Sequence, residues 1–268
     1  MNAHRTVCLA CALVLGSGSV ASAVVVTSFD EGVLNPNVGL DIPNAALASI
    51  SLDTVNNELD MLTNGNTDLW TARNNAPIAW TLSPPVGLGQ TWYVETEVRN
   101  NGAANGAQRV TGLLFYQNVD GTGGSNDGMD FSYGINDWND RSVEVQGLGG
   151  TQVGDSGVSF INALADIGNV ASAFLRVEVT EAGVSDHYVM FYKLNGGDPW
   201  TQLTEFNSTQ DNSRVGLFFK NGSSTAPADR SVSFTYFEVA PVIPEPSTFV
   251  LAVLGMLALA GYARRRKR

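Results

Sequence analysis

Apolar residues alternate with polar residues through most of the chain, and this period of two constrains the fold more than any other feature. The alternation is clear in Thr91–Arg99, Phe174–Thr180, Ser213–Lys220 and Ser231–Val239. Successive side chains of a strand point to opposite faces, so each segment predicts a strand with one buried face. In the first segment the predicted buried set is Trp92, Val94, Thr96 and Val98. In the last segment it is Val232, Phe234 and Tyr236, with Ser233, Thr235 and Phe237 facing outward.

Turn signals separate the predicted strands. Asn-Gly pairs at 64–65, 101–102, 195–196 and 221–222 supply the positive φ angles that tight turns need. Residues 162–170 are the only candidate for a short turn of helix. Roughly a dozen strands without internal repeats, in a segment of about 215 residues, favour a single two-sheet sandwich. We therefore predict one all-β domain over residues 24–240.

The N-terminus has the pattern of a secretion signal. Arg5 precedes an apolar run from Val7 to Leu15, and small residues then lead to an Ala-Ser-Ala sequence that ends at Ala23. A charged region, an apolar region and a small-residue site are typical of a cleavable signal peptide. We predict a signal peptide at residues 1–23, export through the Sec translocon and cleavage after Ala23.

The C-terminus combines an apolar stretch with a basic end. Residues 248–263 are nearly all apolar, and a helix of this length reaches about 24 Å, short of the roughly 30 Å hydrocarbon core. Basic residues of this kind stay on the cytoplasmic side of a membrane. We predict a short transmembrane helix that anchors the chain transiently in the inner membrane, with the domain outside. The basic cytoplasmic end is Arg264, Arg265, Arg266, Lys267 and Arg268.

A Pro-Glu-Pro motif, Pro244, Glu245 and Pro246, precedes the apolar stretch. The motif, the apolar helix and the basic end, in this order over residues 241–268, resemble the PEP-CTERM sorting signal. The resemblance implies recognition of the motif by an exosortase, a membrane enzyme that cuts and transfers such substrates. It also implies a Gram-negative host that makes extracellular polysaccharide. A plain C-terminal membrane anchor is the alternative.

Charge divides the chain into an acidic domain and basic ends. All 26 acidic residues lie between Asp30 and Glu245, whereas six of the 15 basic residues lie outside this range. The range therefore holds nine basic and 26 acidic residues, a net charge of −17. Such a domain repels phosphate backbones, so we predict no nucleic-acid partner. Solubility outside the cell accounts for the acidity, and divalent-cation sites are the alternative.

The order of short segments along the domain carries a second resemblance. These segments are Ser28–Glu31, Asp68–Trp70, Trp92–Val98, Gly112–Tyr116, Phe174–Glu178, Tyr188–Lys193 with Asn195–Thr201, and Arg214–Phe219. Together they resemble the concanavalin A-like lectin/glucanase superfamily, in its laminin-G-like and DUF1349-like branches. The resemblance implies an antiparallel jelly-roll sandwich and a tendency toward carbohydrate contact.

Residues for hydrolytic catalysis are sparse in the predicted domain. Its one histidine is His187, and both cysteines, Cys8 and Cys11, lie in the signal peptide. Glycoside hydrolysis needs two carboxylates that flank the sugar. The glucanases that the domain resembles carry Glu-x-Asp-x-x-Glu, whereas the run from Glu95 to Asn100 lacks the central Asp and the final Glu. We therefore predict that the protein is not an enzyme.

Hard oxygen ligands gather in the glycine-rich loop 118–130, which contains Asp120, Asp127 and Asp130. Calcium prefers six to eight such oxygens, so this loop is the best metal candidate. A hairpin loop without an ion is the alternative, and Asp137 with Asp140 is a weaker metal candidate. We predict no other cofactor.

Aromatic rings can stack on sugar rings, and the chain has five tryptophans. Trp92 alternates with core residues and is predicted to be buried. Trp138 and Trp200 lie beside turn signals and are the predicted carbohydrate contacts.

These features predict a non-enzymatic exported surface or extracellular-matrix protein. Exosortase would sort it into the cell envelope or the extracellular matrix, where it would associate with exopolysaccharide. A lectin-like carbohydrate-binding module, with or without calcium, is one alternative. A divergent glycan hydrolase or lyase is the other.

Overall fold

The computed structural model describes residues 25–29, 32–43, 45–64, 67, 76–100, 109–116, 129–137, 141–147, 163–209, 212–221 and 230–242. The elements named within them are β-strands. They are β1 (Val25–Ser28), β2 (Gly39–Asp41), β3 (Ala48–Asp53), β4 (Glu58–Thr63), β5 (Ile78–Leu82), β6 (Thr91–Asn100), β7 (Arg109–Tyr116), β8 (Met129–Asn136), β9 (Ser142–Gly147), β10 (Ala163–Asp166), β11 (Ser172–Thr180), β12 (Asp186–Lys193), β13 (Thr201–Ser208), β14 (Arg214–Asn221) and β15 (Arg230–Pro241).

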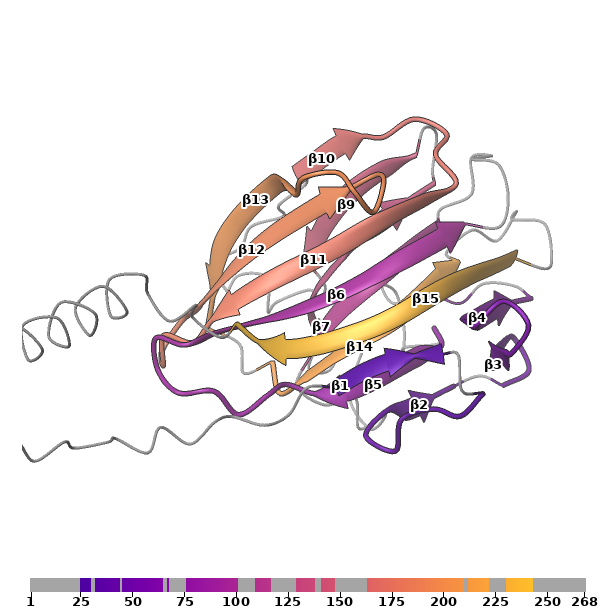
Figure 1. Cartoon of the computed structure of the whole chain (residues 1–268), viewed down its shortest axis with the longest axis horizontal. Coiled ribbons are helices and arrows are strands. Elements are labelled where there is room, and N and C mark those ends of the chain that lie inside the picture. Colours follow the sequence, from indigo (N-terminus) through magenta and orange to yellow (C-terminus); the bar gives the residue numbers. More distant parts are fainter. Residues whose placement is uncertain are drawn as a thin grey trace, which may run out of the picture.

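The strands form two antiparallel sheets that face each other (Figure 1). Sheet A has the order β13-β12-β11-β6-β15-β4-β3, with β1 also paired to β15. Sheet B has the order β10-β9-β8-β7-β14-β5-β2. In Figure 1 the strands β13, β12, β11, β6 and β15 of sheet A run side by side in front of sheet B. The predicted all-β, two-sheet antiparallel jelly-roll sandwich is confirmed.

The core lies between the sheets, where the predicted alternation places it. The inward residues of β6 and β11 are almost fully buried, and Trp92 is only 1% exposed, as predicted. Sheet B faces them with apolar side chains of β7 and β14, and the rings of Trp92 and Phe115 lie 6.3 Å apart. Removing this apolar area from water is the main stabilising term of such a sandwich.

The alternation reverses at one place in β15. The pairing with β6 shifts between Phe234 and Phe237, so Thr235 and Tyr236 together lie opposite Glu97. Beyond this β-bulge Phe237 faces the core and is 1% exposed, whereas the Tyr236 hydroxyl donates a hydrogen bond to Glu95 on the outer face, at 2.5 Å. The predicted inward Tyr236 and outward Phe237 are wrong, because one inserted residue exchanges the faces of the strand that follows.

Both ends of the described domain lie at the same end of the sandwich. Val25 in β1 pairs with Val239 near the end of β15. After β15, the backbone N–H of Val242 donates to the carbonyl of Thr91, at the start of β6, at 2.7 Å. We call this end, where β15 finishes and β6 begins, the tail end. In the part of the chain that the structure describes, no helix is long and apolar enough to cross a membrane.

Asp130 links the two sheets close to the tail end. Its Oδ2 accepts hydrogen bonds from Ser208 Oγ at 2.7 Å and from Asn212 Nδ2 at 2.8 Å. Asn212 Nδ2 also donates to the Tyr188 hydroxyl at 2.9 Å. Burial raises the pKa of Asp130, and the hydrogen bonds from Asn212 and Ser208 oppose this shift. The carboxyl group therefore serves as a buried hydrogen-bond acceptor between the sheets.

The bulge in β15 can be tested by a pair of substitutions. Phe237→Ala should lower the free energy of unfolding by about 3–5 kcal/mol, because it empties a core position. Tyr236→Ala should cost only about 1 kcal/mol, because it removes one hydrogen bond on the outer face. Urea unfolding of the two variants measures the difference. Equal losses, or a larger loss for Tyr236, would contradict the bulged register of β15.

Asp130 should make stability depend on pH in a defined direction. Its pKa is higher in the folded than in the unfolded state, so the folded domain holds this proton more tightly. Stability from this group is therefore present at low pH and is lost as the pH rises through the folded-state pKa. The Asp130→Asn variant cannot ionise at this position. Its free energy of unfolding should match or exceed that of the wild type near neutral pH and should lose this advantage in acid.

Asp130→Ala removes the acceptor for Ser208 and Asn212 and should lower the free energy of unfolding by about 1–3 kcal/mol at any pH. Denaturant unfolding at acidic and neutral pH compares the three proteins, and a wild type more stable than Asp130→Asn at neutral pH would refute the raised pKa.

Candidate functional site

Most of the residues predicted from motifs lie outside the described residues. The structure therefore does not test the roles predicted for these residues. The residues are Ala23, Asp120, Asp127, Trp138, Asp140, Pro244, Glu245, Pro246, Arg264, Arg265, Arg266, Lys267 and Arg268.

The described acidic residues of the predicted metal loops are bound to protein groups. Asp130 accepts hydrogen bonds from Ser208 and Asn212. Asp137 lies between two arginines, with its Oδ2 2.7 Å from Arg109 Nη2 and its Oδ1 2.7 Å from Arg141 Nε. All three members of this ion triad are buried. Within the described ranges no group of three or more His, Cys, Asp and Glu side chains could hold a metal ion.

Trp200 lies on the outer face of sheet A, beside two cations. Lys193 Nζ is 4.4 Å from the centroid of its ring and Arg176 Cζ is 5.8 Å away. Trp200 directly precedes β13, whereas Ser208, the partner of Asp130, ends that strand. The predicted carbohydrate residue Trp200 and the predicted metal residue Asp130 are therefore not brought together.

The outer face of sheet A also carries a network of carboxylates and tyrosines. Glu95 and Glu238 lie directly opposite each other on β6 and β15, a pairing that repulsion alone would disfavour. Two tyrosines donate hydrogen bonds across this pair, Tyr236 to Glu95 and Tyr93 to Glu238. Burial, together with the hydrogen bond to Glu238, raises the pKa of Tyr93 well above its usual value, so this hydroxyl remains a donor. Arg176 adds a positive charge 3.6 Å from Glu95.

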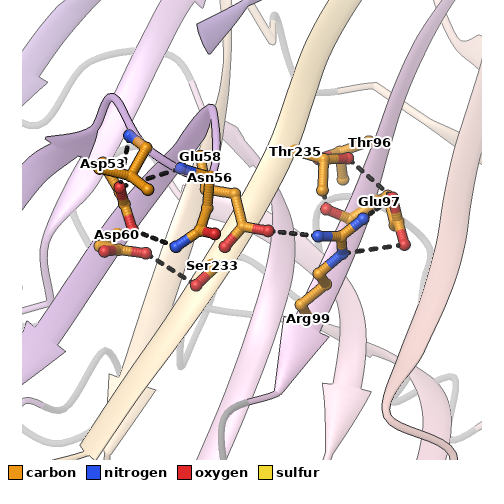
Figure 2. Close-up of polar contacts among 10 residues, drawn as sticks. Asp53, Asn56, Glu58, Asp60, Thr96, Glu97, Arg99, Ser233 and Thr235 are labelled. Carbon is orange, nitrogen blue, oxygen red and sulfur yellow. Dashed lines mark hydrogen bonds and ion pairs between the residues drawn. The ribbon is translucent and has the colours of Figure 1, made fainter. Parts of the chain in front are cut away.

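Figure 2 shows how the neighbouring carboxylates on this face are paired. Arg99 lies between Glu58 and Glu97, with its Nε 3.2 Å from Glu97 Oε1. Thr235, at the bulge, donates to Glu97 Oε2 at 2.9 Å. Glu95 and Glu97 share one face, as predicted, and both are held by neighbouring donors. The outer face of sheet A is therefore an acidic surface whose carboxylates Glu95 and Glu97 are bound by neighbouring side chains.

Sheet B carries a buried polar group on β9. Asn136 Nδ2 donates to Glu144 Oε2 at 2.8 Å, and Glu144 Oε1 has no hydrogen-bond partner. Burial raises the pKa of Glu144. The hydrogen bond from Asn136 and the charge of Lys220 oppose this shift, but their effect is smaller. Glu144 is only 6% exposed, so access of a large ligand to its carboxyl group is restricted.

A groove with an aromatic wall lies at the edge of sheet B near the tail end. The cavity has a volume of about 590 Å³ and is lined by residues 36–39, 80–85 and Val239. Trp80 provides the aromatic wall, Pro36, Pro84 and Pro85 add apolar surface, and Asn37 adds an exposed amide. We call this cavity the Trp80 groove. Apolar walls with a few polar groups are typical of sites for small molecules and sugars.

Two glycines set the position of the Trp80 ring. Gly39 on β2 and Gly216 on β14 are its partners on either side. A Cβ atom on Gly39 would lie only 2.5 Å from Trp80 Cε2, so the indole lies where a side chain of β2 would otherwise stand. Arg214 Cζ is 4.1 Å from the centroid of the ring. Burial raises the pKa of nearby Asp41, and the charge of Arg214 opposes this shift.

A second cavity of about 370 Å³ shares residues 82–85 with the Trp80 groove. Two carboxylates, Glu181 and Asp186, line it together with Trp92 and Asn212. Glu181 Oε1 accepts a hydrogen bond from Trp92 Nε1 at 3.2 Å, and the buried Asn212 Oδ1 has no hydrogen-bond partner. The two cavities share the four lining residues 82–85, and together their linings supply aromatic, amide and carboxylate groups.

Sequence reasoning did not select Trp80, although a signal for it was present. The criterion that selected Trp138 and Trp200 was proximity to a turn signal, and Trp80 precedes the turn-forming Pro84-Pro85 pair. Trp80 also falls on the same alternating set as Ile78 and Leu82, which predicts one face of a strand.

Comparison with family models identifies the C-terminal segment. Residues 242–267 match the PEP-CTERM protein-sorting motif, which confirms the predicted resemblance of this segment. The motif indicates an exported chain with a C-terminal membrane-anchoring sorting signal, and it makes an exosortase the general kind of partner. No curated protein sequence matches the chain.

Solved structures match the fold of the domain at low sequence identity. A xylan β-1,4-xylosidase from Bacillus halodurans matches with a TM-score of 0.53 and 16% identity, over 80% of this chain and 38% of the enzyme. A bifunctional GH43-CE protein from Bacteroides eggerthii matches with a TM-score of 0.50 and 14% identity, over 80% of this chain and 27% of its own. The exoplasmic/lumenal domain of VIP36, in a metal-free form, matches with a TM-score of 0.50 and 12% identity, over 81% and 91% of the two chains. The chain thus spans only 38% and 27% of the first two proteins, and the similarity is one of fold alone. This chain joins an all-β sandwich to a PEP-CTERM protein-sorting motif.

Proposed function

We propose that this protein is a non-enzymatic exported surface or extracellular-matrix protein, which exosortase sorts and which binds extracellular polysaccharide in the Trp80 groove. The Trp80 groove is the observation that carries the binding part of this proposal. The PEP-CTERM match carries the sorting part. The two parts are tested separately.

The position of the motif supports its use as a sorting signal on a folded substrate. The motif begins at Val242, and the N–H of this residue still bonds to Thr91 in sheet A. Pro244 follows two residues later. The Pro-Glu-Pro segment therefore follows the folded domain directly, so that a membrane-embedded enzyme could reach it without unfolding a strand.

The composition of the groove favours a neutral polysaccharide. A tryptophan ring stacks on the apolar face of a sugar, and amide groups fix its hydroxyls. Trp80 and Asn37 both line this cavity, where they would take these two roles. The guanidinium of Arg214 already lies on the Trp80 ring, and its charge acts on Asp41. Because the surrounding domain is strongly acidic, a polyanionic chain would be repelled.

A glycan hydrolase is the second candidate function, and one observation favours it. Glu181 and Asp186 line a single cavity, and paired carboxylates across a sugar are what hydrolysis requires. Each accepts a hydrogen bond from the protein, Glu181 from the Trp92 ring and Asp186 from the backbone of Ala182. These bonds support a structural role for both groups, so we rank binding above hydrolysis.

Loss of the groove tryptophan should weaken retention on polysaccharide. Trp80→Ala should weaken retention on the host's neutral exopolysaccharide by about tenfold, because losing about 50–60 Å² of buried apolar contact costs about 1.4 kcal/mol. Trp200→Ala is a matched control, since both tryptophans are partly exposed and lie beside cations. Affinity electrophoresis of the secreted protein measures retention, and thermal unfolding shows that each variant is folded.

The same experiment separates the alternatives. Loss of retention in Trp200→Ala alone would move the site to the outer face of sheet A. Loss in chelator would add calcium to the site. Release of reducing sugar that stops in Glu181→Gln would favour the hydrolase and contradict the binding proposal.

The sorting motif should be required for processing and not for folding. Replacing Pro244, Glu245 and Pro246 with alanine should leave the tail uncut and hold the protein at the inner membrane. Intact mass and cell fractionation measure the outcome, and cells without exosortase provide the matching control. A variant with the wild-type mass in the wild-type location would refute exosortase sorting.

A further inference from the structure

Three large apolar side chains are exposed at the tail end. Leu82 ends β5 and is 61% exposed, Leu88 in the β5–β6 connection is 77% exposed, and Val184 in the β11–β12 connection is 84% exposed. Single exposed apolar residues are common on any protein surface. A group of them on neighbouring loops marks a contact surface.

The two connections are held side by side. The N–H of Gly89 donates to the carbonyl of Glu181 at 2.7 Å, and the N–H of Glu181 donates to the carbonyl of Gln90 at 3.0 Å. A Cβ atom on Gly183 would lie 2.8 Å from Leu88 Cδ2, so the two loops meet at this point. Leu82 and Glu181 line the same cavity. We call Leu82, Leu88 and Val184 the apolar tip.

One of the two connections in the apolar tip carries no charge, whereas Glu181 and Asp186 flank Val184 in the other. Residues 83–90, with the sequence Ser-Pro-Pro-Val-Gly-Leu-Gly-Gln, contain no charged side chain. The nearby carboxylates of Glu181 and Asp186 accept hydrogen bonds from protein groups. An uncharged loop at one end of a domain with a net charge of −17 can approach an apolar surface at little desolvation cost.

The chain leaves the domain beside this tip. Val242 bonds to Thr91, which follows Gln90 directly. The apolar stretch of the sorting signal begins at Phe249, and from Val242 to Phe249 the backbone can extend by at most about 25 Å. The apolar tip is therefore confined close to the bilayer whenever the sorting signal is inserted.

We propose that the apolar tip rests on the lipid bilayer while the protein is anchored. This proposal goes beyond polysaccharide binding and depends on the sorting signal alone. Leucine and valine side chains at the headgroup boundary gain from burial of apolar area. Three such side chains are too few to hold a free domain, but tethering by the tail raises their effective concentration at the surface. The contact fixes the orientation of the domain over the membrane.

Site-specific fluorescence tests this contact in the chain that retains its sorting signal. The chain without its signal peptide contains no cysteine, so single cysteines introduced at Leu88, Val184 and Gly197 carry an environment-sensitive dye. Gly197 is the control, because it lies in the β12–β13 connection at the opposite end of sheet A and has open space at its Cβ. The labelled chains are reconstituted into phosphatidylcholine vesicles with and without a quencher attached to the lipid headgroup region.

Quenching of at least about twofold at Leu88 and Val184, with little change at Gly197, is expected for an interfacial contact. Adding Leu82→Asp beside either label should reverse this quenching. Chains that fail to float with the vesicles, or equal emission at all three positions, would overturn the proposal. Protection of the dyes only when exosortase is co-reconstituted would also overturn it, because the tip would then dock on a protein.

Discussion

Strand β15 divides one of its edges between two short strands, and much of the domain depends on this arrangement. Along one side it pairs with β6. Along the other side Arg230–Phe234 pairs with β4, and Tyr236–Val239 pairs with β1. The bulge at Thr235 and Tyr236 falls at the junction, and bulges increase local twist. A single C-terminal strand thus joins the first described strand, the β3–β4 hairpin and the centre of sheet A.

On the outer face of sheet A, tyrosine hydroxyls offset a repulsion between two carboxylates that the strand register places together. Pairing β15 with β6 sets Glu238 against Glu95, and like charges directly opposite destabilise a sheet. Tyrosine hydroxyls from the same two strands each donate to the carboxylate on the other strand. Because the bulge turns Tyr236 outward, it supplies one of these donors. The chemistry of the outer face and the register of the core are therefore set by the same inserted residue.

The strands and the buried set of β6 were predictable because a period of two is a local property of the sequence. The PEP-CTERM segment was predictable for the same reason, since its parts are contiguous. The bulge was not predictable, because Phe237 and Tyr236 are both compatible with a core position and only pairing with β6 decides between them. Asp137 has the appearance of a metal ligand in a polar loop, yet its two arginine partners are the first residue of β7 and the residue that precedes β9. Trp80 lies in a groove because its strand partners on either side are Gly39 and Gly216, which are distant from it in the sequence. Long-range register, which local patterns do not encode, accounts for each of these differences.

Because both ends of the described domain lie at the tail end, the sandwich has one end near the sorting signal and one end far from it. If exosortase cuts near Pro244, the retained chain stops within a few residues of Val242, which still bonds to sheet A. Any group joined to that new end would be held against the tail end of the sandwich with almost no linker. The β12–β13 connection, with Asn195 to Trp200, then lies at the end of the domain that is far from this attachment point. An assembly of such molecules would present a uniform outer layer, because each copy would be mounted in the same direction.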